Sequence, residues 1–246
     1  MWYNMRKARF IILFIITQLL FAMGASAQTQ RELRDSLSMI NGLIKQHPTA
    51  VKLYLRKAAL NIELEEWQYA LETYDKVLEM MPGNLTALYY RGFVYQHLKR
   101  YGQARKDYEL LLKLEPLHEH GLMGLVLTNL ADGRITAAFD GANRLVELFP
   151  DNAQSYAVRA DVEKRQKMFE PALDDIRRAI EIEDVEVQKR YPVTVDDDIT
   201  AYQLTAFELY MQMKNQHAAR ACLDYLVKNG VPRAYLNNYY KQLERR

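Results

Sequence analysis

The chain has 246 residues, of which 49% are hydrophobic and 26% are charged, and this balance excludes wholesale disorder. Its 10 glycines and 7 prolines are few, which favours long helices over a turn-rich β fold. The net charge is +2, but Arg6, Lys7 and Arg9 lie in the first 27 residues, and without them 30 basic residues face 31 acidic ones. No basic field remains to attract nucleic acid.

The N-terminal segment has the features of a secretory signal peptide. Its basic residues precede a largely apolar run over residues 10–22, which is too short to span a bilayer comfortably. Residues 25–27 then give a small-x-small cleavage site. We therefore predict that residues 1–27 are a signal peptide and that the protein is exported, to the periplasm, the envelope or the exterior, with no integral membrane span after cleavage. An uncleaved membrane anchor is the alternative.

Residues 28–48 are predicted to form an N-terminal capping helix. The apolar residues in this stretch recur at helical spacing, and they are Leu33, Leu37, Ile40, Leu43 and Ile44. This helix is expected to cover the open side of the element that follows, as helical arrays need at their termini.

A 34-residue period organises the next part of the chain. Two residue types keep this step in phase, namely Pro48, Pro82, Pro116 and Pro150, and Ala70, Ala104, Ala138 and Ala172. A shared period in two residue types indicates internal repeats. We place four repeats at residues 51–84, 85–118, 119–152 and 153–184.

Each repeat has the apolar pattern of two packed helices. Positions 4, 8 and 11 share one face of a first helix, and positions 17, 20, 24 and 27 share one face of a second helix. A small residue at position 8 and the alanine at position 20 let the two helices approach closely. Proline at position 32 ends the second helix. Asn84 and Asn152 are expected to cap the next first helices.

This pattern resembles the tetratricopeptide repeat (TPR). The second repeat carries the resemblance best, through Gly92, Tyr95, Tyr101, Ala104, Tyr108 and Pro116. Elsewhere Val126 stands where a small residue is usual, Ala142 replaces an aromatic residue, and Asp184 stands where proline would fall. The resemblance implies an all-α fold, a right-handed superhelical solenoid of antiparallel helix pairs.

The phase breaks after the fourth repeat. We predict an insertion or linker over residues 185–198, which ends in an acidic run. Ala219 then restores the pattern, so residues 199–232 are predicted to form a degenerate TPR-like helix pair. Residues 233–246 are predicted to form a C-terminal capping helix, whose tyrosines pack inward: Tyr235, Tyr239 and Tyr240.

The resemblance also implies a binding site. TPR ligands usually lie in a concave groove lined by positions 2, 5, 9 and 12 of the first helices. The groove residues predicted here are Leu55, Ala59, Tyr89, Phe93, Gln96, His120, Met123 and Leu127. The remaining equivalent positions hold Lys52, Ile62, Thr86, Leu130, Gln154, Ala157, Asp161 and Lys164. Most are apolar, which points to an apolar or amphipathic protein segment as partner. The alternative is that the protein fills its own groove.

The carboxylate clamp of chaperone-binding TPR domains is not expected, because the corresponding positions hold Leu55, Ala59, Tyr90, His120 and Gly124.

We expect no catalysis, cofactor or metal. The sequence contains no phosphate-binding glycine loop and no nucleophile elbow. Residues 118–120 read His-Glu-His, but no third ligand lies nearby, so a solvated turn is the better interpretation. Cys222 is the only cysteine in the sequence, and it is expected to act as a small core hydrophobe.

The sequence therefore predicts an exported scaffold or adaptor that mediates protein–protein interaction. Three alternatives stay open: a periplasmic holding chaperone for apolar segments, a self-association module that forms a homo-oligomer, and an unrecognised enzyme.

Overall fold

A computed structural model describes residues 29–188 and 197–244 of the chain. Within these ranges the secondary structure is helical throughout, so the predicted all-α fold is confirmed. The chain divides into two compact units, Met1–Leu98 and Lys99–Arg246. The predicted signal peptide lies outside the described residues.

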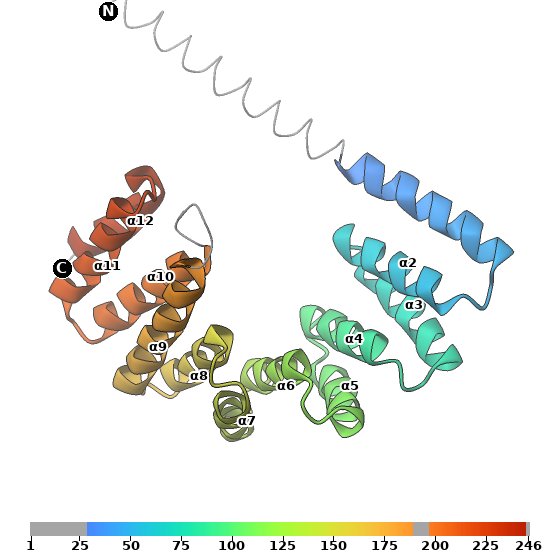
Figure 1. The fold of residues 1–246 in the computed structure, drawn as a ribbon, viewed down its shortest axis with the longest axis horizontal. Helices are drawn as coiled ribbons and strands as arrows, with labels where there is room; N and C mark the ends of the chain where they lie inside the picture. Colours follow the sequence, from blue (N-terminus) through green and yellow to red (C-terminus); the bar gives the residue numbers. More distant parts are fainter. Residues whose placement is uncertain (1–28, 189–196, 245–246) are drawn as a thin grey trace, which may run out of the picture. The chain divides into compact units, whose positions relative to one another are not determined.

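The first unit contains a helix over residues 29–46, followed by α2 (Val51–Glu63), α3 (Trp67–Met80) and α4 (Leu85–His97). α2 and α3 lie side by side as an antiparallel pair (Figure 1). Their shared core contains Ala58, Ala70, Leu71, Tyr74 and Val77, together with Ala87 and Val94 of α4.

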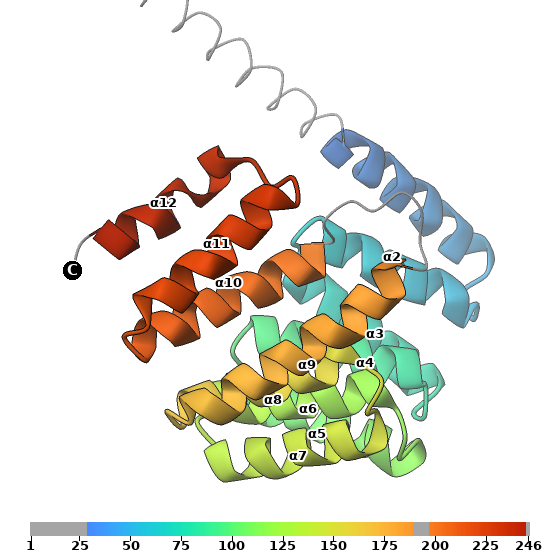
Figure 2. The ribbon, with the colours of Figure 1, turned by 60° about the vertical axis from the view of Figure 1, so that its left-hand side comes forward.

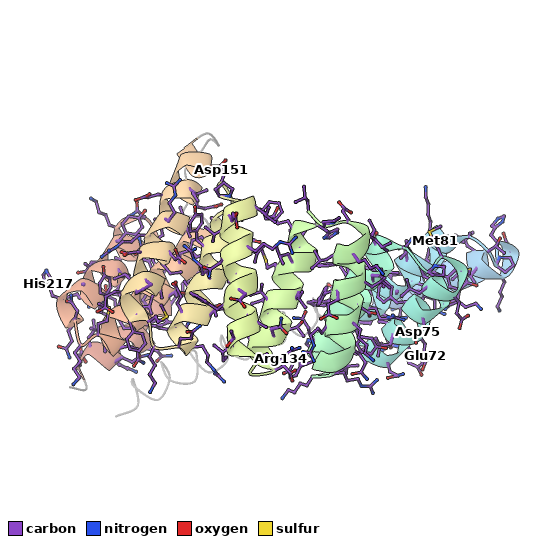
Figure 3. The ribbon with its side chains drawn as sticks, turned by 90° about the horizontal axis from the view of Figure 1, so that it is seen from below. Glu72, Asp75, Met81, Arg134, Asp151 and His217 are labelled. Atoms are coloured by element: carbon purple, nitrogen blue, oxygen red, sulfur yellow. The ribbon has the colours of Figure 1, made fainter. Side chains whose placement is uncertain are left out.

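The second unit repeats this arrangement. Its helices are α5 (Tyr101–Leu114), α6 (Glu119–Ala131), α7 (Ile135–Leu148), α8 (Ala153–Arg165), α9 (Phe169–Gln188), α10 (Asp197–Gln212), α11 (Gln216–Lys228) and α12 (Arg233–Glu244). The helices α6 with α7, α8 with α9, and α10 with α11 form packed pairs, and α12 packs on α11 (Figure 2). Figure 3 shows Arg134 and Asp151 at the two ends of α7.

The periodic residues have the roles that their spacing predicts. The repeated alanines at 70, 104, 138 and 172, and Ala219 in the fifth pair, are all fully buried. Each repeated proline follows shortly after the end of a second helix, as at Met80 before Pro82. The side chains of Asn84 and Asn152 accept hydrogen bonds from the N–H groups of Ala87 and Gln154, so both cap first helices as expected.

The turns inside the pairs α2–α3, α6–α7, α8–α9 and α10–α11 each have one residue in the left-handed region. These residues are Glu65, Gly133, Lys167 and Lys214, with φ between 58° and 75°. In the α2–α3 turn the N–H of Glu66 donates to the carbonyl oxygen of Asn61 at 2.7 Å. The N–H of Glu65 donates to the carbonyl oxygen of Ile62 at 2.9 Å. This is the Schellman arrangement, which satisfies the last carbonyls of a helix.

The left-handed turns give a stability prediction. Lys167 is exposed and bears a side chain in a conformation that glycine adopts at less cost. We expect Lys167→Gly to raise the free energy of unfolding by about 0.5–1 kcal/mol, measured by urea denaturation. Gly133→Ala is the matched reverse change, because a Cβ there meets no atom within 4 Å. It should lower stability by a similar amount, and a neutral result would contradict the strain argument.

A glycine on the partner helix compensates for the bulky residue in the third repeat. Val126 occupies position 8 of α6, where a small residue was expected, and it is fully buried. A Cβ added at Gly141 of α7 would lie 2.7 Å from Cγ2 of Val126. The space for close helix approach is therefore provided by α7 instead of α6.

The structure differs from the predicted linker over residues 185–198. α9 continues through Gln188, because Asp184 replaces the proline that stops the other second helices. α10 begins at Asp197, and the acidic residues of its first turn favour a helix N-terminus. The rest of the predicted linker lies outside the described residues.

The C-terminal tyrosines do not all pack inward as predicted. Tyr240 is buried and donates a hydrogen bond to Asp224 at 2.8 Å, and Tyr239 lies edge-on to the buried ring of Phe207. Tyr235 is 78% exposed, so the prediction is wrong for this residue. It lies one residue before Leu236, which takes the inward position at this turn of α12.

Candidate binding groove

The predicted groove residues of the first unit lie on α2 and α4. Leu55, Ala59, Tyr89 and Gln96 are half-buried, and Leu55 packs against the unit's core. Phe93 is 39% exposed. Of this set, Phe93 offers the largest accessible apolar surface to a partner.

Phe93 contacts Trp67, and a further aromatic pair lies on the same helix as Phe93. The ring of Trp67 lies 6.5 Å from that of Phe93 and stacks on His97 at 3.7 Å. Tyr89 and Tyr90 meet edge to face at 5.0 Å on the same helix. Partly exposed aromatic side chains that are held by their neighbours are suited to act as binding anchors.

In the second unit, predicted groove residues line a pocket of about 580 Å³. Its lining residues are Tyr101, Leu127, Leu130, Ala131, Asp161, Lys164 and Arg165. Leu127, Leu130, Asp161 and Lys164 occupy groove positions 9 and 12 of two successive first helices, α6 and α8. Met123 is half-buried against the core and His120 is exposed, and neither lines the pocket.

The pocket has an apolar half and a charged half. Leu127, Leu130 and Ala131 of α6 supply the apolar half. On α8, the ammonium group of Lys164 lies 3.2 Å from a carboxylate oxygen of Asp161, and 3.7 Å from Glu208 of α10. Because these charges are partly exposed, the pairs contribute little to stability and stay available to a ligand.

Three lining residues were missed by the sequence prediction, and two of them could have been found. Ala131 and Arg165 lie four residues after Leu127 and Asp161, one helical turn farther along the same face. Tyr101, at the start of α5, had been assigned only to the helix-pair core.

The His-Glu-His sequence has a structural role. Nδ1 of His118 accepts a hydrogen bond from the N–H of Gly121 at 3.0 Å, so this histidine caps α6. Among the residues that the structure describes, no three His, Cys, Asp or Glu side chains gather as a metal site would require. Cys222 is buried, and burial raises the pKa of its thiol to about 11, which keeps it protonated and unreactive.

Sequence comparison connects the chain to TPR proteins. Residues 86–118 match the model of the tetratricopeptide repeat family. A stretch of 126 residues is 28% identical to small glutamine-rich tetratricopeptide repeat-containing protein 2 of Saccharomyces cerevisiae, and covers 50% of this chain and 35% of that protein. A stretch of 67 residues is 37% identical to the peptidyl-prolyl cis-trans isomerase PASTICCINO1 of Arabidopsis thaliana, over 27% of this chain and 11% of that protein.

These curated relatives are thus matched over about a tenth to a third of their length. Their whole-protein activities are not carried over to this chain.

Solved structures share the fold. A tetratricopeptide repeat protein from Parabacteroides merdae superposes with a TM-score of 0.63 at 19% identity, over 88% of this chain and 80% of that chain. YrrB, described as a TPR protein with an unusual peptide-binding site, superposes with a TM-score of 0.54 at 20% identity, over 82% and 97%. The chain is therefore an all-α solenoid of helix pairs. The repeat pattern and the family match over residues 86–118 make the chain similar to TPR repeat proteins.

Proposed function

We propose that the protein is an exported, non-catalytic scaffold or adaptor that binds a segment of a partner protein in the groove of its first helices. The observation that carries this proposal is the pocket between α6 and α8, where equivalent positions of two successive repeats line one cavity. TPR proteins bind protein or peptide partners, which supports the general role.

The pocket's two halves suit an amphipathic segment. An apolar side chain of the partner would bury surface against Leu127 and Leu130, at about 25 cal/mol per Å² of apolar area removed from water. Polar groups of the same segment would meet Asp161, Lys164 and Arg165. A helix or an extended strand can present such a pattern.

The export proposal rests on the first 27 residues. Their basic start, apolar run and small-x-small site match a signal peptide. In the described part of the chain, no helix has the length and apolar character needed to cross a membrane.

Site-specific crosslinking combined with groove variants tests the proposal. Residues 28–246 carrying a photoreactive amino acid at position 131 would be exposed to a cell-envelope extract, and the crosslinked partners identified by mass spectrometry. Ala131 is exposed, so Ala131→Phe should fill the pocket without removing a core contact. We expect Ala131→Phe to weaken binding of the crosslinked partner by about tenfold or more, measured by calorimetry with the purified partner.

Tyr235→Asp is the matched control, because Tyr235 is an exposed aromatic residue on α12 that lines neither pocket. It should leave binding unchanged. Many unrelated partners that bind equally to all variants would contradict a specific adaptor and favour a holding chaperone. Crosslinks to a second copy of this chain, with a mass that rises with concentration, would favour self-association.

A further inference from the structure

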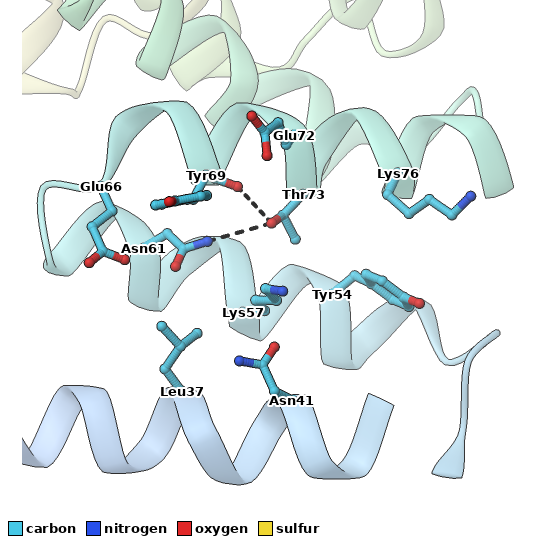
Figure 4. A pocket seen from close by; sticks show the side chains of 10 residues that line it. All are labelled: Leu37, Asn41, Tyr54, Lys57, Asn61, Glu66, Tyr69, Glu72, Thr73 and Lys76. Atoms are coloured by element: carbon cyan, nitrogen blue, oxygen red, sulfur yellow. Dashed lines mark hydrogen bonds between the residues drawn. The ribbon is translucent and has the colours of Figure 1, made fainter. Parts of the chain in front are cut away.

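A second pocket, of about 370 Å³, lies in the first unit outside the predicted groove. It is lined by the helix over residues 29–46, α2 and α3 (Figure 4). Most of its lining residues carry polar groups, and the lining comprises Leu37, Asn41, Tyr54, Lys57, Asn61, Glu66, Tyr69, Glu72, Thr73 and Lys76.

Most polar groups around this pocket have partners within the protein. Glu66 pairs with Arg34 at 3.4 Å, and Lys76 pairs with Glu79 at 2.8 Å. Glu72 is exposed and accepts a hydrogen bond from Gln68 at 3.5 Å. The hydroxyls of Tyr54 and Thr73 donate to backbone carbonyl oxygens at 3.0 and 2.7 Å.

Lys57 has no such partner. It is half-buried on α2, and its ammonium group has no ion pair or hydrogen bond with any described residue. Figure 4 shows Lys57 between α2 and the N-terminal helix, with Asn41 facing it.

The other repeats show what normally neutralises a cation at this position. Arg91 and Arg159 occupy the place of Lys57 in the second and fourth repeats. Arg91 donates to Asp75, sixteen residues earlier, at 2.7 Å. Arg159 forms two hydrogen bonds of 2.7 Å with Asp175, sixteen residues later. In each case a carboxylate from a neighbouring second helix pairs with the cation.

In the first repeat, both of these places hold neutral side chains. Asn41 lies sixteen residues before Lys57 and Thr73 lies sixteen residues after it, and both line the pocket. Asn61 adds a further donor: it is 1% exposed, and its amide donates only to Thr73 Oγ1, at the long distance of 3.5 Å. A cation and underused amide donors therefore surround a cavity that lacks the carboxylate present in the sister repeats.

We propose that this pocket binds a carboxylate supplied by a ligand. Lys57 provides the charge, the amides of Asn41 and Asn61 donate hydrogen bonds, and Leu37 and the ring of Tyr54 form apolar walls. A charge-assisted bond of this kind is stronger than a neutral one, particularly where water is partly excluded. The volume suits a ligand of about amino-acid to dipeptide size. The carboxylate can belong to a free small molecule or chain terminus, or to an acidic side chain within a peptide.

Isothermal titration of purified residues 28–246 with defined probes tests the proposal. N-acetylphenylalanine carries a free carboxylate, its primary amide lacks one, and a capped tripeptide centred on glutamate carries a side-chain carboxylate. We expect saturable binding of at least one carboxylate probe in the millimolar range, and binding of the amide at least about tenfold weaker. The acetylated amino acid and the capped tripeptide distinguish the two sources.

The key variant restores the internal carboxylate. Asn41→Asp places an acid where Asp75 stands for Arg91, so it should pair with Lys57, weaken probe binding about tenfold or more, and leave the melting temperature unchanged or higher. Lys57→Met should also abolish binding. Lys52→Met is the matched control, because Lys52 is an exposed lysine on the same helix that lines neither pocket.

The proposal is overturned if no carboxylate probe saturates the wild type, or if Asn41→Asp and Lys57→Met bind as well as Lys52→Met does. Either result leaves the groove proposal untouched, because the groove is tested with different residues and a different readout.

Discussion

Gly124→Leu is expected to lower the free energy of unfolding by about 3 kcal/mol or more. Gly124 is buried on α6, and a Cβ at this position would lie 2.5 Å from Cζ of Tyr108 and 2.7 Å from its Cε1. The ring of Tyr108 is fully buried on α5, so it cannot move aside without displacing the side chains packed around it. Relief therefore requires α5 and α6 to separate, which removes apolar contacts along both helices. Urea denaturation followed by circular dichroism measures the loss.

Gly102→Ala is the matched control for this change. Gly102 also lies in a helix, α5, but a Cβ there meets no atom within 4 Å. This substitution should raise stability by about 0.5 kcal/mol through helix propensity. If Gly124→Leu were as stable as the wild type, this result would contradict the close packing of Gly124 against Tyr108.

Glu163→Gln is expected to stabilise the protein near neutral pH by roughly 3 kcal/mol, since each pKa unit corresponds to about 1.4 kcal/mol. Glu163 lies on α8 and is 5% exposed, and its Oε2 has no hydrogen-bond partner. Burial, and secondarily the negative charge of Asp175, raises the pKa of its carboxyl group to about 7, against the opposing effect of Arg159. Arg159 is itself held by Asp175, so it neutralises Glu163 incompletely.

The pH dependence follows from this raised pKa. The unfolded chain releases the Glu163 proton around the ordinary value of 4.5, whereas the folded protein keeps it up to about 7. The contribution of Glu163 to stability is therefore fully present below about pH 4.5, and it is lost as the pH rises through 7. The advantage of Glu163→Gln should be absent at pH 4 and reach its full size above pH 7.

Thermal melts of both proteins across this pH range check the prediction. Glu170→Gln is the control, because Glu170 is an exposed glutamate at the start of the neighbouring helix α9. It should change the melting temperature little. A constant difference between Glu163→Gln and the wild type at every pH would show that ionisation of Glu163 is not the cause.

The helix pairs could be predicted from the sequence because their packing is periodic. The buried alanines let two helices approach closely, and the prolines end the second helices. Both requirements recur every 34 residues. The substitute at Gly141 could not be predicted, because it depends on which α7 residue meets Val126. The length of α9 was also missed, because the absence of proline at 184 permits a longer helix without fixing its end.

The candidate sites were predictable to different degrees. Groove positions on the first helices α6 and α8 follow from helix geometry, so Leu127 and Asp161 were identified. Tyr101 was missed because it lies on α5, which is a second helix. The pocket around Lys57 requires the register of the N-terminal helix against α2, which brings Asn41 opposite Lys57. The 34-residue period aligns Lys57 with Arg91 and Arg159 in the sequence. Only the structure shows that these two arginines pair with carboxylates, and therefore that Lys57 lacks such a partner.

The left-handed turns also bear on how such a chain can change its length during evolution. The turns of the pairs α2–α3, α6–α7, α8–α9 and α10–α11 satisfy their backbone hydrogen bonds inside their own pair, so such a pair relies on its neighbours chiefly for apolar cover. A block of 34 residues can therefore be copied or lost without leaving an unpaired backbone group at the junction. The pair α10–α11 is an example, because it follows the break in the 34-residue phase and still keeps the pattern. Lys214 has a left-handed backbone conformation in its turn, and Ala219 is buried between its helices.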